Sequence, residues 1–136
     1  DNVESRGLGD VYKRQMHVLT QAPYRCCVAK HNGKIVGSVV YSIHGTTDGH
    51  RMVYIELLAS EMADVGTLLF KYMRALPGVN YFLAWCVKTA AANALYQRQL
   101  PQVNTPVARS LMLSLVCKDP QYKLRPDLLL RCDYVS

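Results

Sequence analysis

The stretch that most constrains the fold is residues 52–98, MVYIELLASEMADVGTLLFKYMRALPGVNYFLAWCVKTAAANALYQR. It predicts a strand, a turn that contains a glycine, an amphipathic helix, a second strand and a short alanine-rich helix. Two strands joined by a helix are expected to run parallel through a right-handed crossover. The first helix should begin near Asp64, Val65, Gly66 and Thr67, and a helix start presents unpaired N–H groups to an anion. The stretch therefore predicts an α/β unit that can hold an anionic group at a strand-to-helix junction.

The flanking sequence predicts further strands. Asn32-Gly33 supplies the two positive-φ positions of a tight hairpin turn between strands over residues 24–30 and 35–43. A polar loop over 45–50 should lead to a strand over 51–59. The predicted elements then follow in order: a helix over 65–76, a strand over 80–87, a helix over 89–99, a strand over 106–117 and a final strand within 127–135. An antiparallel hairpin followed by β-α-β-α-β is a mixed α/β (α+β) sheet.

Helix boundaries follow from local chemistry. Ser60 or Asp64 is expected to cap the first helix and Pro77-Gly78 to end it. Thr89 is expected to cap the second helix, which should end before Pro101.

Composition narrows the class of protein. The chain has 136 residues, enough for one domain with a core, and a formal net charge of +6. No run of 18 apolar residues is present, so no membrane span is expected. The five cysteines are odd in number and form no CxxC pair, which favours reduced, mostly buried thiols in a cytoplasmic protein. The histidines show no metal-ligand spacing with them, so no zinc site is expected.

The first fifteen residues differ from the rest. They have no amphipathic period, and their segment SRGLGDVYKRQ resembles translated sequencing-adaptor sequence of the kind found in metagenomic fragments. We therefore expect residues 1–15 to be non-native or disordered and residues 16–136 to form a single domain.

Several motifs resemble the GNAT superfamily of N-acetyltransferases. The strand Tyr54-Ile55-Glu56-Leu57-Leu58-Ala59, the helix start Gly66-Thr67-Leu68-Leu69, and a later helix with Ala92, Leu95-Tyr96 and Arg98 are similar to the family's strand, cofactor loop and following helix. The hairpin around KHNGKIVGSVVY is also similar to the family's early strands. The resemblance covers about residues 24–100 and implies a GNAT-like mixed sheet that lacks the usual N-terminal strand and helices.

The resemblance implies a reaction and the residues that perform it. The protein would be an acetyl-CoA-dependent N-acetyltransferase that transfers an acetyl group directly to a small-molecule or peptide amine. Tyr96 would be the general acid and Glu56 the base. Acetyl-CoA would be bound by residues on the strand, at the helix start and on the second helix: Leu57, Leu58, Ala59, Val65, Gly66, Thr67 and Arg98. Cys86, on the strand before the second helix, is expected to be a buried structural thiol.

The loop between Ala59 and Gly66 departs from the family pattern. It looks shorter than usual, and Glu61 and Asp64 bring two carboxylates to the expected pyrophosphate site, where like charges repel. Lys71, Arg74 or Arg98 could supply positive charge. A second hypothesis is therefore a catalytically inactive acyltransferase-like binding module. A third, suggested by the +6 charge and the nine tyrosines, is a basic nucleic-acid-binding α/β domain. We rank it last because the tyrosines fall mostly in predicted core elements and are not interleaved with a basic patch.

Overall fold

The structure is a computed structural model that describes residues 24–88 and 90–135. The predictions for residues 1–15 and for Thr89 lie outside these ranges. No helix in the described part of the chain is long and apolar enough to cross a membrane. The same ranges contain no group of three or more His, Cys, Asp or Glu side chains that could hold a metal ion.

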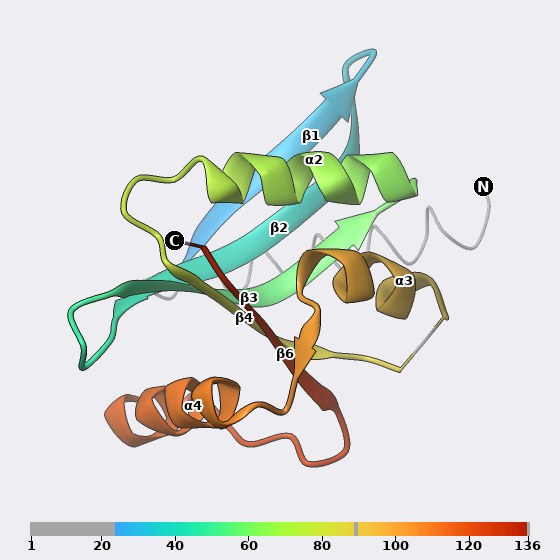
Figure 1. The fold of residues 1–136 in the computed structure, drawn as a ribbon. Helices are drawn as coiled ribbons and strands as arrows, with labels where there is room; N and C mark the ends of the chain where they lie inside the picture. The colour runs from blue at the N-terminus through green and yellow to red at the C-terminus, as the bar shows by residue number, and fades with distance from the viewer. Residues whose placement is uncertain (1–23, 89, 136) are drawn as a thin grey trace. The chain divides into compact units, whose positions relative to one another are not determined.

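The chain forms a six-stranded mixed sheet with helices (Figure 1). The sheet order is β1-β2-β3-β4-β6-β5, so β3 and β4 are neighbours and α2 connects them along the chain. This is the predicted mixed α/β fold. In chain order the elements are β1 (Arg25–His31), β2 (Lys34–Gly45), β3 (Arg51–Ser60), α2 (Ala63–Arg74), β4 (Tyr81–Cys86), α3 (Ala90–Gln99), β5 (Gln102–Val103), α4 (Pro106–Lys118) and β6 (Leu129–Tyr134).

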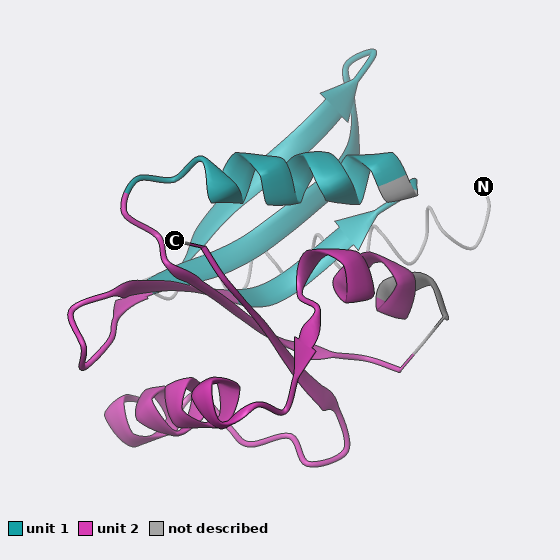
Figure 2. Ribbon diagram, in the orientation of Figure 1, with its two compact units in different colours: residues 1–43, 55–77 teal, residues 44–54, 78–136 magenta. Residues whose placement is uncertain are grey.

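The chain divides into two compact units, coloured separately in Figure 2. The first contains residues 1–43 and 55–77, and the second contains residues 44–54 and 78–136. Strands β2 and β3 each contribute residues to both units. The units are described one at a time below.

In the first unit, β1 and β2 form the predicted antiparallel hairpin. Asn32 and Gly33 have φ angles of 51° and 75°, the left-handed values that a two-residue hairpin turn requires. The Asn-Gly prediction is therefore confirmed. The register shifts once, between Ala29 and Lys30.

Helix α2 covers this part of the sheet and contacts β1 (Figure 1). Its buried stripe is Val65, Leu69, Phe70 and Met73, which have helical spacing. The helix approaches closely because position 37 is a glycine. A Cβ atom on Gly37 would lie 2.5 Å from Cγ1 of Val65 and 3.2 Å from the carbonyl oxygen of Ala59.

In the second unit, β4 pairs with β6 in an antiparallel register that separates two faces. One face carries Leu83 and Trp85 opposite Cys132 and Leu130, and it packs against α4 in a core that also contains Met52, Tyr54 and Tyr122. The other face carries Ala84 opposite Arg131 and Cys86 opposite Leu129. Arg131 hydrogen-bonds to residues in and just after α3, so α3 lies on this second face.

The predicted strand over 106–117 is wrong, because Pro106–Lys118 is the helix α4. Pro106 stands in the first turn, where its missing N–H costs nothing, and the side chain of the N-cap Thr105 accepts a hydrogen bond from Ala108 N–H at 3.1 Å. The buried residues Ala108, Leu111, Met112 and Leu115 have the helical i, i+3, i+4, i+7 spacing. The predicted final strand is confirmed as β6.

Candidate functional site

The end of β3 leads directly into α2 in the first unit. Glu56, Leu57, Leu58 and Ala59 lie along β3 and are all partly buried. The turn that follows is fixed to β2 by a backbone hydrogen bond from Glu61 N–H to Val36 C=O at 2.9 Å. A Lys34 ammonium lies 3.9 Å from the Glu61 carboxylate, which reduces the negative charge of this turn.

Helix α2 begins without a side-chain cap. Its N-cap residue is Met62, in extended conformation and with no side-chain cap hydrogen bond, so the prediction that Ser60 or Asp64 caps the helix is wrong. Asp64 stands inside the first turn, where its Oδ1 accepts a hydrogen bond from Val65 N–H at 3.1 Å. A helix N-terminus of this kind carries partial positive charge that no N-cap side chain neutralises.

The amides of Val65 and Gly66 belong to the helix itself. Both donate to the Met62 carbonyl, at 3.1 and 3.4 Å. Both residues are buried, whereas Thr67 is exposed. A helix that starts at Ala63 leaves the N–H groups ahead of Val65 without a carbonyl partner inside the helix.

Tyr96 and Arg98 lie on α3 in the second unit. Arg98 is exposed, but the Tyr96 side chain is buried, with a relative exposure of 8%. Burial, with a smaller contribution from neighbouring Cys86, raises the pKa of the Tyr96 phenol well above its usual value of 10. The phenol therefore keeps its proton throughout the neutral range. Glu56 belongs to the first unit and Tyr96 to the second.

A buried cation lies beneath α3, and the sequence did not single it out. Arg131 has a relative exposure of only 4%. Its Nη2 donates to the side-chain oxygen of Asn93 at 3.0 Å and its Nη1 to the carbonyl of Leu100 at 3.2 Å, while its Nε has no hydrogen-bond partner among the described residues. Within residues 24–88 and 90–135 no carboxylate forms an ion pair with it. The only sequence signal was an arginine between two apolar residues of a short strand.

Cys86 lies close to both Tyr96 and Arg131. Its side chain is fully buried, and burial raises the pKa of its thiol while the Arg131 guanidinium lowers it. The thiol donates a weak hydrogen bond to the carbonyl of Val87. Buried thiols of raised pKa are poor nucleophiles, so this environment is that of a structural cysteine.

No protein-family model matches the sequence, and no curated protein matches it. Among solved structures, the chain is similar to an acetyltransferase of the GNAT family from Streptococcus pneumoniae. The two are 14% identical in sequence, the TM-score is 0.53, and the match covers 89% of this chain and 74% of the other. At this identity the likeness shows the fold alone, and the fold of the chain is GNAT-like.

Proposed function

We propose that this protein is an acetyl-CoA-dependent N-acetyltransferase. The observation that carries the proposal is the start of α2, a helix that follows β3 directly and has no side-chain cap at Met62. A pyrophosphate is a fitting partner for such a helix end, because it accepts hydrogen bonds from the first N–H groups and interacts favourably with the helix dipole. The GNAT-like fold supports the same assignment.

In this proposal the β3 backbone at Leu57, Leu58 and Ala59 binds the extended arm of the cosubstrate. Val65, Gly66 and Thr67 form the first turns of α2 next to the phosphates. Because the N–H groups of Val65 and Gly66 are already bound to Met62, the contacts to phosphate would come from Ala63 and Asp64. Bound acetyl-CoA supplies the acetyl thioester.

Glu56 and Tyr96 would handle the two protons of the transfer. Glu56, directly or through a water, would accept the proton that the attacking amine loses as its nitrogen bonds to the carbonyl carbon. Tyr96 would give its proton to the departing sulfur as the C–S bond breaks.

The acceptor would be a small-molecule or peptide amine. The test is acetyl transfer to a panel of amines by the full chain, followed as free thiol released from acetyl-CoA. No thiol release above the uncatalysed rate, by a protein that binds acetyl-CoA, would contradict the proposed activity.

A catalytically inactive binding module is the second candidate, and Asp64 is the observation that favours it. Its exposed carboxylate lies in the first turn of α2 and accepts from Val65 N–H, so it competes with a phosphate for the same helix end. This candidate predicts that the folded protein neither binds acetyl-CoA nor releases thiol from it.

A further inference from the structure

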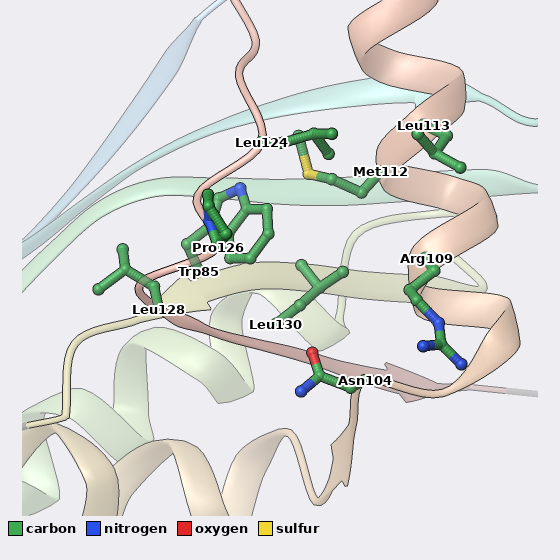
Figure 3. Close-up of a pocket in the computed structure, with 9 residues that line it drawn as sticks. All are labelled: Trp85, Asn104, Arg109, Met112, Leu113, Leu124, Pro126, Leu128 and Leu130. Carbon is green, nitrogen blue, oxygen red and sulfur yellow. The ribbon is translucent and has the colours of Figure 1, made fainter.

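A pocket of about 360 Å³ lies in the second unit between α4 and the β4–β6 strand pair (Figure 3). Trp85 and Leu130 come from the strands, Met112 and Leu113 from α4, and the segment after α4 closes the remaining side. That segment contributes Leu124, Pro126 and Leu128. The volume is that of a small-molecule site and is too large to be a packing defect.

The residues that form the walls of this pocket are mostly apolar, and two of these residues are partly exposed to solvent. Leu113 and Leu124 have relative exposures of 49% and 52%. The indole nitrogen of Trp85 is covered and has no hydrogen-bond partner among the described residues, so the ring offers the pocket an apolar surface. A ligand with a hydrocarbon body would remove this surface from water, at about 25 cal/mol per Å².

The polar groups of the lining are gathered at one end. Arg109 and Asn104 lie together where α4 begins (Figure 3). Asn104 is fixed in a left-handed conformation, with a φ of 49°, and its N–H donates to the Leu130 carbonyl at 2.9 Å. The backbone of Asn104 is therefore held against β6.

Arg109 gives this end a positive charge. No Asp or Glu lines the pocket, and no carboxylate in the described part of the chain forms an ion pair with the Arg109 guanidinium. The N-terminal end of α4 adds the positive side of its helix dipole at the same place.

We propose that this pocket binds a small molecule with an apolar body and one carboxylate, the chain lying along Trp85, Met112 and Leu130 and the carboxylate between Arg109 and Asn104. A medium-chain carboxylate has this combination of shape and charge. The inference concerns only the second unit and holds whether or not the protein transfers acetyl groups.

Trp85 is the only tryptophan of the chain, so its fluorescence reports directly on this pocket. The full chain is titrated with octanoate, and in parallel with octylamine and octanol, which keep the apolar body and change the charge. Saturable binding of octanoate, at least fivefold tighter than octylamine, is the expected result. No saturable signal with octanoate, or equal affinity for the amine, overturns the proposal.

Arg109→Gln removes the charge at the polar end, and Lys30→Gln removes an exposed charge on β1 as the matched control. We expect Arg109→Gln to weaken octanoate about fivefold and to leave octanol unchanged, because an exposed ion pair contributes up to about that factor. Lys30→Gln should change neither. Octanoate binding that is unaffected by Arg109→Gln contradicts the assignment of the carboxylate.

Self-association is measured in the same experiment. A Trp85 signal that changes with protein concentration in the absence of octanoate would show that a second copy of the chain covers these apolar walls, and it would overturn the small-molecule proposal. Far-ultraviolet circular dichroism of each variant shows that it is folded.

Discussion

The guanidinium of Arg131 donates a hydrogen bond to the side-chain oxygen of Asn93 across 3.0 Å and so joins β6 to α3, the helix that carries Tyr96. The same guanidinium binds the carbonyl of Leu100, just after the end of that helix. One buried cation thus fixes both the middle and the end of α3. We therefore expect the position of Tyr96, the proposed general acid, to depend on this contact.

Replacing Arg131 should therefore destabilise the protein. Arg131→Ala removes both donors and leaves a cavity, and we expect it to lower the free energy of unfolding by about 2–4 kcal/mol in urea denaturation. The control is Arg98→Ala, which replaces an exposed arginine on α3. It should change the free energy of unfolding by less than about 0.5 kcal/mol. Similar losses in the two variants would show that the Arg131 contacts do not anchor α3.

Gly37 and Val65 test the packing of α2. Gly37→Ala should destabilise the protein by about 1–3 kcal/mol, because its Cβ would lie 2.5 Å from Val65 Cγ1. Val65→Ala removes the clashing methyl groups, so the double variant should lose at least about 0.5 kcal/mol less than the sum of the single variants. Strict additivity in denaturation midpoints would show that the two residues do not meet.

His44 makes stability depend on pH. Its ring nitrogen Nε2 lies 3.0 Å from the Tyr122 hydroxyl; burial lowers the pKa of the imidazole, neighbouring Lys118 lowers it further, and Asp119 partly opposes them. A lowered folded-state pKa means that the unfolded chain binds a proton first as pH falls. The free energy of unfolding should therefore decrease as pH falls below about 6.5, the ordinary histidine value.

His44→Gln should remove this part of the pH dependence, whereas His31→Gln on the exposed hairpin should leave it in place. Thermal melting between pH 7.5 and 5 measures both. A wild-type slope that survives in His44→Gln would assign the effect to another group.

Tyr96→Phe tests the proposed acid. We expect kcat to fall by about 10²–10⁴-fold, the usual range for a general acid, with the fold retained. Because the pKa of Tyr96 is raised by burial, its ionisation should cause no loss of activity between pH 7 and 9. Tyr72→Phe, at a half-exposed position on α2, is the matched control. Equal kcat in Tyr96→Phe and wild type would remove Tyr96 from the mechanism.

The sequence predicted the parts of the fold that local chemistry determines. Asn32-Gly33 favours positive φ at two successive positions, and the apolar spacing over residues 65–76 indicates a helix; the structure contains both features. The sequence over 106–117 predicts a strand because its apolar residues are nearly continuous from Leu111 to Cys117. The helix signals there, Thr105 followed by Pro106, occupy only its first turn.

The burial and the side-chain contacts of the candidate site residues could not be predicted from the sequence, because they depend on packing between distant segments. The residues near Tyr96 in the sequence do not indicate that its side chain is buried. Those near Arg131 do not indicate that it hydrogen-bonds to Asn93 of α3, 38 residues earlier in the chain. The cap of α2 was also misassigned. Ser60 is the last residue of β3, and Asp64 lies inside the helix. The N-cap is therefore Met62, and methionine has no preference for this position.

Calorimetric titration of the full chain with acetyl-CoA tests the central claim most directly. We predict saturable one-to-one binding, strengthened a few-fold in Asp64→Asn because the competing carboxylate at the start of α2 is removed. Lys34→Gln, which frees the Glu61 carboxylate, should weaken binding. Absence of saturable binding by wild type and Asp64→Asn, with circular dichroism showing both proteins folded, would contradict the assignment of this helix start as the cosubstrate site.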